Sequence, residues 1–483
     1  MVRALAIDVG TSSVRTALVD THGNLSHVRR ERLTVRTPQP GEVELDALEI
    51  GRLALTLANQ TLDEGGLCDA VGITNQRATT IVFDPTNGEP VGPALGWQDL
   101  RTVIDCLVLQ ERSVRLAPNQ SATKIKWLVE HSGRAASDLR FATIETWITW
   151  LLSNGATFVT DQSNAGVNGL VEVGVNAWDE RVLEILGIDR AMLPSIVDTM
   201  GAYGPASALR GAPPITALVG DQPASLFGQS RITHGAKITF GTGAMLDMVL
   251  GDVGPSEMTR YASGCFPVVV RSQLGKITWG LEGIVLAAGS CIEWLRDDLN
   301  LINSASDSER LATSVESTDG VVFVPALSGL GTPKWDFGAR GGFFGITRGT
   351  SRAHLVRAVL EGIAQRGVDL IDAAQVESHT VINEVRVDGG MTANRFFVQR
   401  LADFSGRPIA VSSELEATTR GVGLMALVSA GHLSLDDVER IWTPAEVFMP
   451  SLSDADRALE RAQWSHAVER VERTIPELSA IEF

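Results

Sequence analysis

The amino-acid sequence predicts an α/β protein built from two related domains, and three observations support this. Apolar, β-branched runs alternate with segments of helical periodicity, which is typical of α/β architecture. With 483 residues the chain is long for one hydrophobic core, so two or three domains are expected. A strand–turn–strand plan near the start is repeated about half a chain later, at residues 236–251.

Strands are expected where short apolar runs end at turn residues. In chain order, the expected strands are residues 4–7, 15–19, 70–73, 80–83, 215–219, 236–240, 245–250, 320–324 and 384–387. Helices are expected between them.

Two helices are predicted in detail. The stretch "TSRAHLVRAVLEGIAQRGVDLIDAAQ" can be capped by Thr350 or Ser351, and we expect a core helix. Its apolar face comprises Leu355, Val356, Val359, Leu360, Ile363, Val368 and Ile371. A last helix, from about Ser453, is expected to pack through Ala455, Ala458, Leu459, Ala462 and Val468.

The opening stretch "ALAIDVGTSSVRTALVDTHGNL" predicts a strand, a tight turn and a second strand. Its bend gathers Asp8, Gly10, Thr11, Ser12 and Ser13. Glycine, aspartate and serine favour turns for backbone reasons alone. The same residues could hold a phosphate on backbone N–H groups and hydroxyls, with the carboxylate facing a metal ion. The stretch by itself leaves both interpretations open.

The repeat of this plan gives the phosphate interpretation more weight. "AKITFGTGAMLDMVLG" again runs from an apolar strand through a Gly-Thr turn, Gly241 to Gly243, into a second apolar strand. Two like domains, each offering a phosphate-holding hairpin to a shared cleft, would explain both copies. A boundary near residue 230 follows, with domains at 1–230 and 231–483.

Composition and charge exclude several classes of partner. The chain has 41 Lys and Arg against 58 Asp and Glu, a net charge of −17, which disfavours binding to nucleic acid or to anionic membranes. No apolar run approaches the roughly 18 residues of a membrane span, and no signal peptide is recognisable, so a cytoplasmic protein is expected. Four scattered cysteines suggest neither a zinc site nor a disulfide framework: Cys68, Cys106, Cys265 and Cys291.

Two glycine-containing motifs have a structural and a functional interpretation. No GxxxxGK[ST] motif is present, so the common P-loop route to ATP is absent. "GVGLMA", residues 421–426, fits GxGxxA, but no good strand precedes it, and its glycines more plausibly allow close helix packing. "VRVDGGMTANRFF", residues 385–397, is a strand, an Asp-Gly-Gly turn and a helix, where Gly389 and Gly390 would let a flat ligand approach and Asn394 could donate to it.

Asp221 stands in "ALVGDQPASLFGQ", directly after a buried strand and at a helix start. An aspartate at this position is usually an N-cap. In a cleft it could instead be a general base that accepts a hydroxyl proton during attack on a phosphoryl group.

Taken together, these segments resemble the FGGY-family carbohydrate kinases, and within that family the chain is most similar to the glycerol kinases. The matching segments lie in the family's order from about residue 3 to residue 431. "GGFFGITRGTSRAHLVRAVLE" matches the family's second signature throughout. The others are "GITNQRATT", "SATKIKWLVEH", "GDQPASLFGQ", "ITFGTG", "LEGIVLAAGSCIEWLRDDL", "PALSGLGTPKWDFGARGGFFGITRG" and "RVDGGMTANRFF".

The resemblance implies an actin-like ATPase fold, with two ribonuclease-H-like domains around a nucleotide cleft. It also implies transfer of the γ-phosphoryl group of MgATP to a sugar or polyol hydroxyl. By position, Asp8 would approach magnesium through water. The implied nucleotide-binding residues are Thr11, Ser12, Ser13, Arg15, Thr242, Gly243, Gly289, Glu293, Gly390 and Asn394.

The resemblance assigns the catalytic base to Asp221. Arg77, Asp221 and Gln222 would bind acceptor hydroxyls, and Trp97 would pack against the acceptor's carbons. Departures from the glycerol kinases gather in this pocket. At three positions that the resemblance assigns to the acceptor site, this chain differs from the glycerol kinases: it has Ala78 in place of a glutamate, Asn119 in place of a tyrosine and Met245 in place of an aromatic residue. On the nucleotide side, only Glu293 departs, standing where glutamine is usual.

The sequence therefore predicts an ATP- and Mg²⁺-dependent kinase of a small polyol or sugar. The altered pocket favours a four- or five-carbon polyol or ketose over glycerol. A divergent glycerol kinase is the alternative, and a non-catalytic actin-like sensor a remote one, since Asp8 and Asp221 are both present. We expect neither nucleic acid nor a membrane as a partner. We do expect the chain to form a homo-oligomer, either a dimer or a tetramer.

Overall fold

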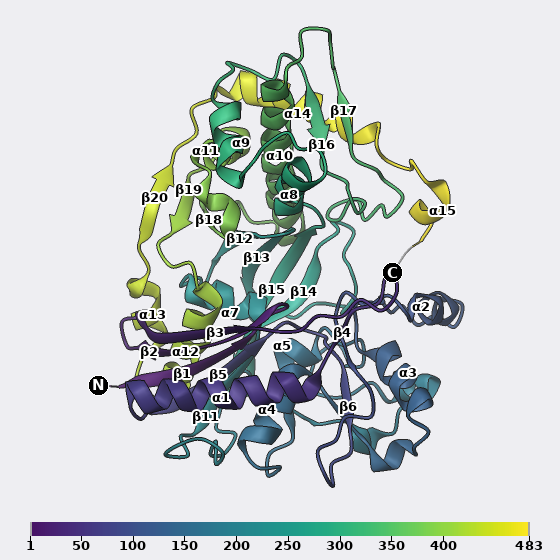
Figure 1. The fold of residues 1–483 in the computed structure, drawn as a ribbon, viewed down its shortest axis with the longest axis vertical. Coiled ribbons are helices and arrows are strands. Elements are labelled where there is room, and N and C mark those ends of the chain that lie inside the picture. The colour runs from purple at the N-terminus through teal and green to yellow at the C-terminus, as the bar shows by residue number, and fades with distance from the viewer. Residues whose placement is uncertain (1, 482–483) are drawn as a thin grey trace.

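The first part of the chain forms a five-stranded sheet (Figure 1). The structure is a computed structural model that describes residues 2–481. The strand order is β11-β5-β1-β2-β3, comprising β1 (Arg3–Val9), β2 (Ser13–Asp20), β3 (Leu25–Arg32), β5 (Ala70–Asn75) and β11 (Ile215–Gly220). Every residue of β5 and β11 is buried, as expected for strands covered on both faces.

A second sheet of seven strands follows in the order β14-β15-β13-β12-β18-β19-β20. Its strands are β12 (Gly235–Phe240), β13 (Ala244–Gly251), β14 (Phe266–Gln273), β15 (Lys276–Val285), β18 (Val385–Asp388), β19 (Ile409–Ser412) and β20 (Pro444–Phe448). The predicted second hairpin is confirmed, because β12 and β13 pair antiparallel around the turn at residues 241–243.

The two sheets share one topological unit. In the first, β1 pairs antiparallel with β2 and parallel with β5, which is parallel to β11. In the second, β12 pairs antiparallel with β13 and parallel with β18, which is parallel to β19. The repeat that the sequence predicts from the two hairpins thus also includes the two parallel strands beside each hairpin.

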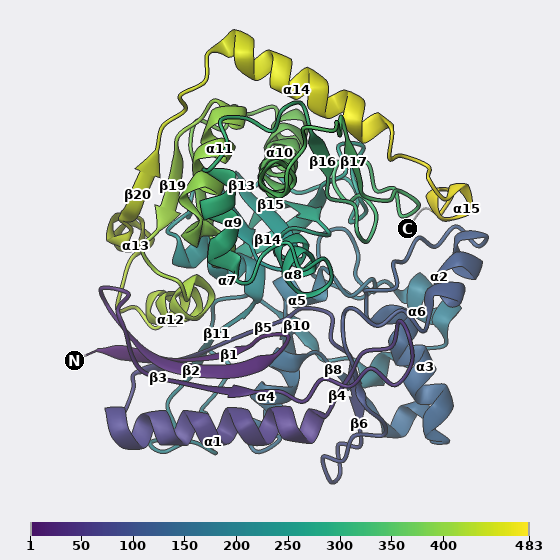
Figure 2. The same ribbon diagram turned by 45° about the horizontal axis from the view of Figure 1, so that its top comes forward.

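Three helices sandwich the first sheet. Helix α1 (Ala47–Gly65) covers one face, and α7 (Asp221–Gly228) with α12 (Ala417–Ser429) covers the other (Figure 2). A Cβ on Gly421 would lie 1.8 Å from the backbone oxygen of Ala224, and one on Gly228 would lie 1.9 Å from that of Ala417. The prediction that the glycines of "GVGLMA" serve close helix packing is therefore confirmed.

The second sheet packs on the predicted core helix, α10 (Arg352–Ser378), and on α11 (Arg395–Ser405). Ser351 caps α10 in a reciprocal capping box with His354. Of the predicted apolar face only Leu355 is not fully buried. Because α10 lies inside the domain, it is buried on most of its circumference.

The remaining elements are short or peripheral. Residues 80–83 give only β6, which pairs with β8 rather than joining a main sheet. The short strands are β4 (Glu44–Leu45), β6 (Ile81–Phe83), β7 (Ala94–Leu95), β8 (Arg140–Ala142), β9 (Val159–Asp161), β10 (Ser195–Val197), β16 (Val322–Val324) and β17 (Gly342–Phe344). The other helices are α2 (Val103–Gln110), α3 (Ala122–Ser132), α4 (Ile144–Leu152), α5 (Gln162–Ala165), α6 (Glu180–Leu186), α8 (Gly289–Asp297), α9 (Ala305–Ala312), α13 (Leu435–Ile441), α14 (Asp454–Glu469) and α15 (Pro476–Ser479).

The last long helix, α14, begins after its cap Ser453 as predicted, but only Val468 of its predicted packing face is buried. Leu459 is 60% exposed, whereas Trp464, Ala467 and Val468 are buried. The small alanines of the expected face would bury little area. The indole N–H of Trp464 donates to Asp369 on α10 at 3.1 Å, which anchors the buried face.

Within residues 2–481, no helix is long and apolar enough to cross a membrane.

Candidate active site at the junction of the two sheets

Two neighbouring strand ends of the first sheet bring Arg77 and Asp221 together. Strands β5 and β11 are parallel, with Asn75 opposite Gly220, so the residues that follow them emerge at the same edge. Arg77 Nε lies 3.3 Å from Asp221 Oδ1. Burial raises the pKa of Asp221, and the positive charges of Arg77 and Lys237 oppose that rise.

Gly220 provides the space for this pair. A Cβ at Gly220 would lie 2.5 Å from Arg77 Cδ, although its φ of −64° suits any residue. The side chain of Arg77 therefore depends on the missing Cβ rather than on unusual backbone geometry.

We expect Gly220→Ala to displace Arg77 and to lower kcat/KM for the acceptor about tenfold or more, because small misplacements of binding groups weaken alignment. The KM for ATP should change little. Steady-state kinetics with each substrate varied in turn would measure both. Gly349→Ala is the matched control, because a Cβ there would be in ordinary contact with Thr347 Oγ1 at 3.6 Å and Asp319 Oδ2 at 3.9 Å. An unchanged acceptor kcat/KM in Gly220→Ala would refute the displacement.

The second sheet faces this pair with a row of three charged residues. Lys237 on β12, Asp247 on β13 and Glu282 on β15 are direct cross-strand neighbours. Lys237 Nζ lies 2.9 Å from Asp247 Oδ2 and donates to Gln222 Oε1 at 2.7 Å. Glu282 accepts a short hydrogen bond from Arg77. These contacts join the two sheets directly beside Asp221.

The sequence analysis did not identify this row of charged residues, although the sequence contains a pattern that could have indicated it. Lys237, Asp247 and Glu282 are charged residues within otherwise apolar strands, and all are buried. Burial and the nearby charge of Asp247 raise the pKa of Glu282 to about 7, and Arg77 opposes that rise. Buried charges of this kind are rare unless they are paired, so they mark a junction with other charged groups.

At the first hairpin, the Asp8 carboxylate is buried and paired. Arg15 Nη1 donates to Asp8 Oδ2 at 2.9 Å, and Thr419 Oγ1 donates to the same oxygen at 2.7 Å. Arg15 also pairs with Glu416 at 2.6 Å. Burial raises the pKa of Asp8, while the charge of Arg15 and the Thr419 hydroxyl lower it.

The other residues of this turn have different surroundings. Trp97 Nε1 donates to Thr11 Oγ1 at 3.5 Å, which brings an expected acceptor residue beside an expected phosphate residue. Ser12 is exposed. Ser13 is buried, and its hydroxyl accepts from Arg30 Nε at 3.1 Å.

At the second hairpin, the Gly-Thr turn is braced by the start of α8. Gly289 N donates to Gly241 O at 2.9 Å, and Ser290 N donates to Thr242 O at 3.1 Å. A Cβ at Gly289 would lie 2.5 Å from Gly241 O, so this contact requires glycine. Thr242 and Gly289, predicted separately from the sequence, therefore belong to one backbone cluster.

Several predicted site residues have other surroundings or remain apart. Asn394 caps α11 by accepting from Phe397 N at 2.9 Å and donates to Ser308 Oγ at 3.2 Å. Asn119 and Glu293 are exposed, and Gly390 begins a short 3-10 turn at Gly390–Ala393. Met245 is half-buried on β13, two residues before Asp247 and therefore on the same face of the strand.

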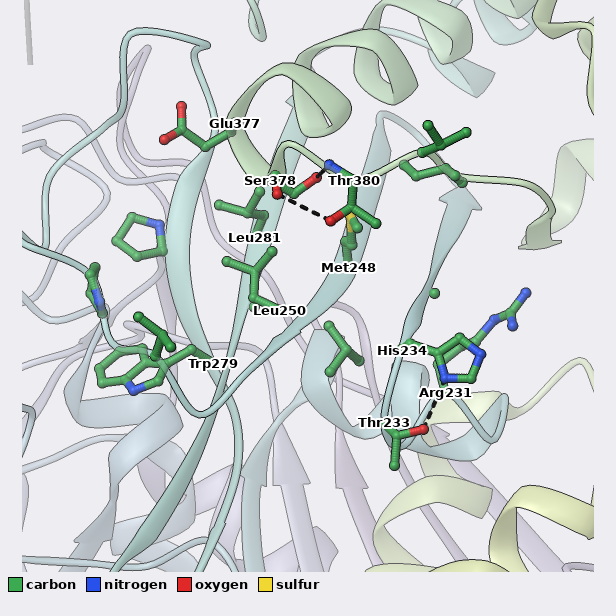
Figure 3. Close-up of a pocket in the computed structure, with 18 of the residues that line it drawn as sticks. Arg231, Thr233, His234, Met248, Leu250, Trp279, Leu281, Glu377, Ser378 and Thr380 are labelled. Carbon is green, nitrogen blue, oxygen red and sulfur yellow. Dashed lines mark hydrogen bonds between the residues drawn. The ribbon is translucent and has the colours of Figure 1, made fainter.

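A cavity with a volume of about 610 Å³ lies elsewhere (Figure 3). It opens where β12 begins and α10 ends, and its walls include Arg231, Met248, Trp279 and Thr380. None of the predicted site residues lines it.

The repeated sheet unit, with a hairpin in each copy and an arginine–carboxylate pair between them, has the architecture of the actin-like ATPase fold. The chain matches "FGGY family of carbohydrate kinases, N-terminal domain" over residues 3–228 and the C-terminal domain of that family over 236–430. The chain therefore belongs to the FGGY family of carbohydrate kinases. It is a phosphotransferase that acts on an alcohol group of a sugar or polyol.

Relatives and solved structures agree with this assignment. The chain is 39% identical to a glycerol kinase of Dechloromonas aromatica, over 96% of this chain and 97% of that one. It is 36% identical to a glycerol kinase of Geobacillus kaustophilus, over 96% and 98%. The crystal structure of Plasmodium falciparum glycerol kinase with ADP superposes with a TM-score of 0.90 at 29% identity, covering 100% of this chain and 99% of that one.

The fold is also shared with kinases of larger sugars. A ligand-bound xylulose kinase from Lactobacillus acidophilus superposes with a TM-score of 0.84 at 19% identity, covering 97% of this chain and 98% of that one. At this identity the likeness concerns the fold alone.

Proposed function

We propose that this kinase transfers the γ-phosphoryl group of MgATP to a hydroxyl of a small polyol or sugar, with Asp221 as the general base. The observation that carries this proposal is the placement of Asp221 beside Arg77, opposite the charged row of the second sheet. In this assignment residues 1–230 bind the acceptor and phosphates, and residues 231–483 complete the nucleotide site.

Asp221 accepts the proton of the attacking hydroxyl, and Arg77 and Gln222 hold the acceptor. The Asp221 side chain is 30% exposed, so an acceptor hydroxyl can reach it, and the positive charge of Arg77 favours the ionised form that a base requires. Lys237 fixes the side-chain amide of Gln222 from the second sheet. Phosphoryl transfer depends mainly on alignment and charge neutralisation, which these groups supply without covalent chemistry.

Asp8 fits a hydrated magnesium ion. Among residues 2–481, both side-chain donors to Asp8 reach Oδ2, which leaves Oδ1 as the oxygen that metal-bound water would meet. Bound magnesium neutralises phosphate charge during transfer. Phosphate oxygens would be held at the first turn by Thr11, Ser12, Ser13 and Arg15, and at the second turn by Thr242 and Gly243.

The adenosine portion is assigned to the start of α8 and to the turn after β18. Gly289 packs against the Gly-Thr turn, Gly390 leaves open backbone, and Glu293 and Asn394 lie four residues further along the chain from each glycine. Among residues 2–481, nothing lies within 4 Å of the Cβ that Gly390 lacks, so a flat base can approach there.

The acceptor pocket supports a ligand with several hydroxyls. Gln76 Nε2 and Oε1 and Arg77 Nη1 are buried, with no hydrogen-bond partner in the part of the chain the structure describes. Ala78 is buried, with a φ of 60°, and supplies only a methyl group where a carboxylate is expected in glycerol kinases. A polyol or ketose of four or five carbons would meet these unpaired groups and reach Asn119, Met245 and Trp97.

The alternative acceptor is glycerol. It is favoured by the names of the relatives, which are glycerol kinases at 36–39% identity. A polyol series of increasing length separates the two possibilities, because each unmatched polar group costs about 1–3 kcal/mol of discrimination.

We expect at least one four- or five-carbon polyol or ketose to exceed glycerol in kcat/KM by about tenfold or more. ADP release would be measured with glycerol, tetritols, pentitols and ketoses at fixed MgATP. Equal or better kinetics with glycerol would make this chain a divergent glycerol kinase. No acceptor-dependent ADP release with any compound would favour a non-catalytic sensor.

We further propose that the chain forms a dimer or a tetramer, and light scattering of the same sample would test this.

A further inference from the structure

Two buried carboxyl groups outside the candidate active site form a polar cluster with no part in the proposed chemistry. Asp161 ends β9, and Glu145 lies in the first turn of α4; both are fully buried. Glu145 Oε1 accepts from Thr160 at 2.7 Å and from Thr146 at 3.1 Å. Burial raises the pKa of both groups, that of Asp161 to about 7 with a further contribution from the charge of Glu145.

Asp161 is linked to the base through one serine. The Ser163 hydroxyl donates to Asp161 Oδ2 at 2.5 Å and accepts from the backbone N–H of Gly220 at 2.8 Å. Gly220 precedes Asp221 and is the residue against which Arg77 packs. A side-chain hydroxyl thus holds the end of β11 at the point where the strand passes into α7.

A second branch reaches the strand that carries Arg77. Asn164 Nδ2 donates to Asp161 Oδ1 at 2.7 Å. Asn75 Nδ2 donates to Asn164 Oδ1 at 3.0 Å and to Gln76 O at 2.9 Å. Asp161 therefore accepts from two side chains that extend to the ends of β11 and β5.

Helix capping explains only part of this arrangement. Asp161 caps α5 by accepting from Ser163 N at 2.8 Å, which satisfies the helix start. The Ser163 hydroxyl is not needed for that cap. Ser163 is only 2% exposed. Its hydroxyl oxygen accepts from the buried backbone N–H of Gly220, which would otherwise be unpaired.

We propose that Asp161 and Ser163 are positioning residues that hold Gly220, and with it Asp221 and Arg77, in the geometry needed for phosphoryl transfer. The inference rests on the proposed function, because it takes Asp221 as the base. The Ser163 hydroxyl acts through the backbone of Gly220 and touches neither substrate. Asp161 orients that hydroxyl by accepting a hydrogen bond from it, which leaves a lone pair of the serine oxygen directed toward Gly220 N–H.

The test is a double-mutant cycle between Ser163 and Asp221. We expect Ser163→Ala to lower kcat about tenfold or more with an unchanged KM for MgATP. In an Asp221→Asn background the same change should have little further effect, because the base it positions is already gone. Asp161→Asn should resemble Ser163→Ala, since its amide would place a donor toward either Ser163 or Asn164.

Thr160→Val is the matched control. It removes one hydrogen bond from the same buried cluster, on the Glu145 side, and leaves the Ser163–Gly220 contact intact. We expect it to lower the melting temperature as much as Ser163→Ala while kcat stays within about twofold of wild type. A folded Ser163→Ala enzyme with wild-type kcat, or an equal loss in both Asp221 backgrounds, would overturn the proposal.

Hydrogen exchange gives a readout that does not depend on activity. The peptide covering residues 215–222 should exchange faster in Ser163→Ala than in wild type or Thr160→Val, because Gly220 N–H loses its acceptor. Unchanged exchange there would overturn the Ser163 contact even if the enzyme is an active kinase. Failure of wild-type protein to turn over any acceptor would instead overturn the proposed function, and the exchange result would still stand by itself.

Discussion

Asp221→Asn is expected to lower kcat by about 100-fold or more, with a change in KM for MgATP of no more than about threefold. Asparagine keeps the shape of the side chain and can still accept from Gln222 N, which now donates to Asp221 Oδ1 at 2.9 Å. It cannot accept a proton from the attacking hydroxyl. The loss should therefore appear in the chemical step and not in nucleotide binding.

The pH profile provides a second signature of this base. Burial raises the pKa of Asp221, so activity should be present above that raised pKa and fall as pH drops through it. This acidic limb should be absent from the residual activity of Asp221→Asn. Steady-state kinetics across pH, with ADP release as the signal, would measure both effects.

Asp84→Asn is a suitable control, because it also neutralises an aspartate paired with an arginine, Arg134, at 2.8 Å, away from the two strand ends. It should retain near-wild-type kcat. Near-normal turnover in Asp221→Asn would remove the assignment of the base, and a large loss in both variants would point to stability instead.

Asp8→Asn is expected to lower kcat/KM for MgATP by about 100-fold or more and to raise the magnesium concentration needed for half-maximal rate. The amide oxygen can still accept from Thr419, so the local packing is retained. The negative charge that would attract the hydrated cation is lost. Arg15 keeps Glu416 as an ion-pair partner, so the variant should fold.

Magnesium titrations at several ATP concentrations would measure this effect, together with thermal shift by ATP with and without magnesium. Asp20→Asn, at the opposite end of the same hairpin and bonded to Asn24, is the control and should keep the wild-type magnesium dependence. If Asp8→Asn shows the same magnesium dependence as wild type, Asp8 does not face the metal.

The features of the fold that could be predicted from the sequence are local ones. Both hairpins and the helix-packing glycine Gly421 were predicted correctly, and the cap of α10 is Ser351, one of the two residues predicted for it. Each depends on residues close in sequence, through turn chemistry, side-chain capping or apolar periodicity. The face of α14 was predicted correctly only at Val468, because distant partners, among them Asp369 on α10, bury Trp464 instead of the alanines.

The residues of the candidate site also fall into a group that was predicted from local sequence and a group that was not. Asp8, Asp221 and the Gly-Thr turn were identified from their positions at strand ends, and their exact roles stay predictions. The charged row of Lys237, Asp247 and Glu282 was missed, because its members come from three strands and are paired only across the sheet.

The sequence by itself determined the α/β class, the repeated hairpin plan and the resemblance to FGGY kinases. These follow from strand, turn and helix patterns in which neighbouring residues specify one another. Only the tertiary structure decided which groups surround Asp221. The pairing of Arg77 with Glu282, and the contact of Ser163 with Gly220, each join residues that are far apart in the chain. Such contacts form when buried polar groups must find partners after the sheets pack, and local patterns carry no record of which partner they meet.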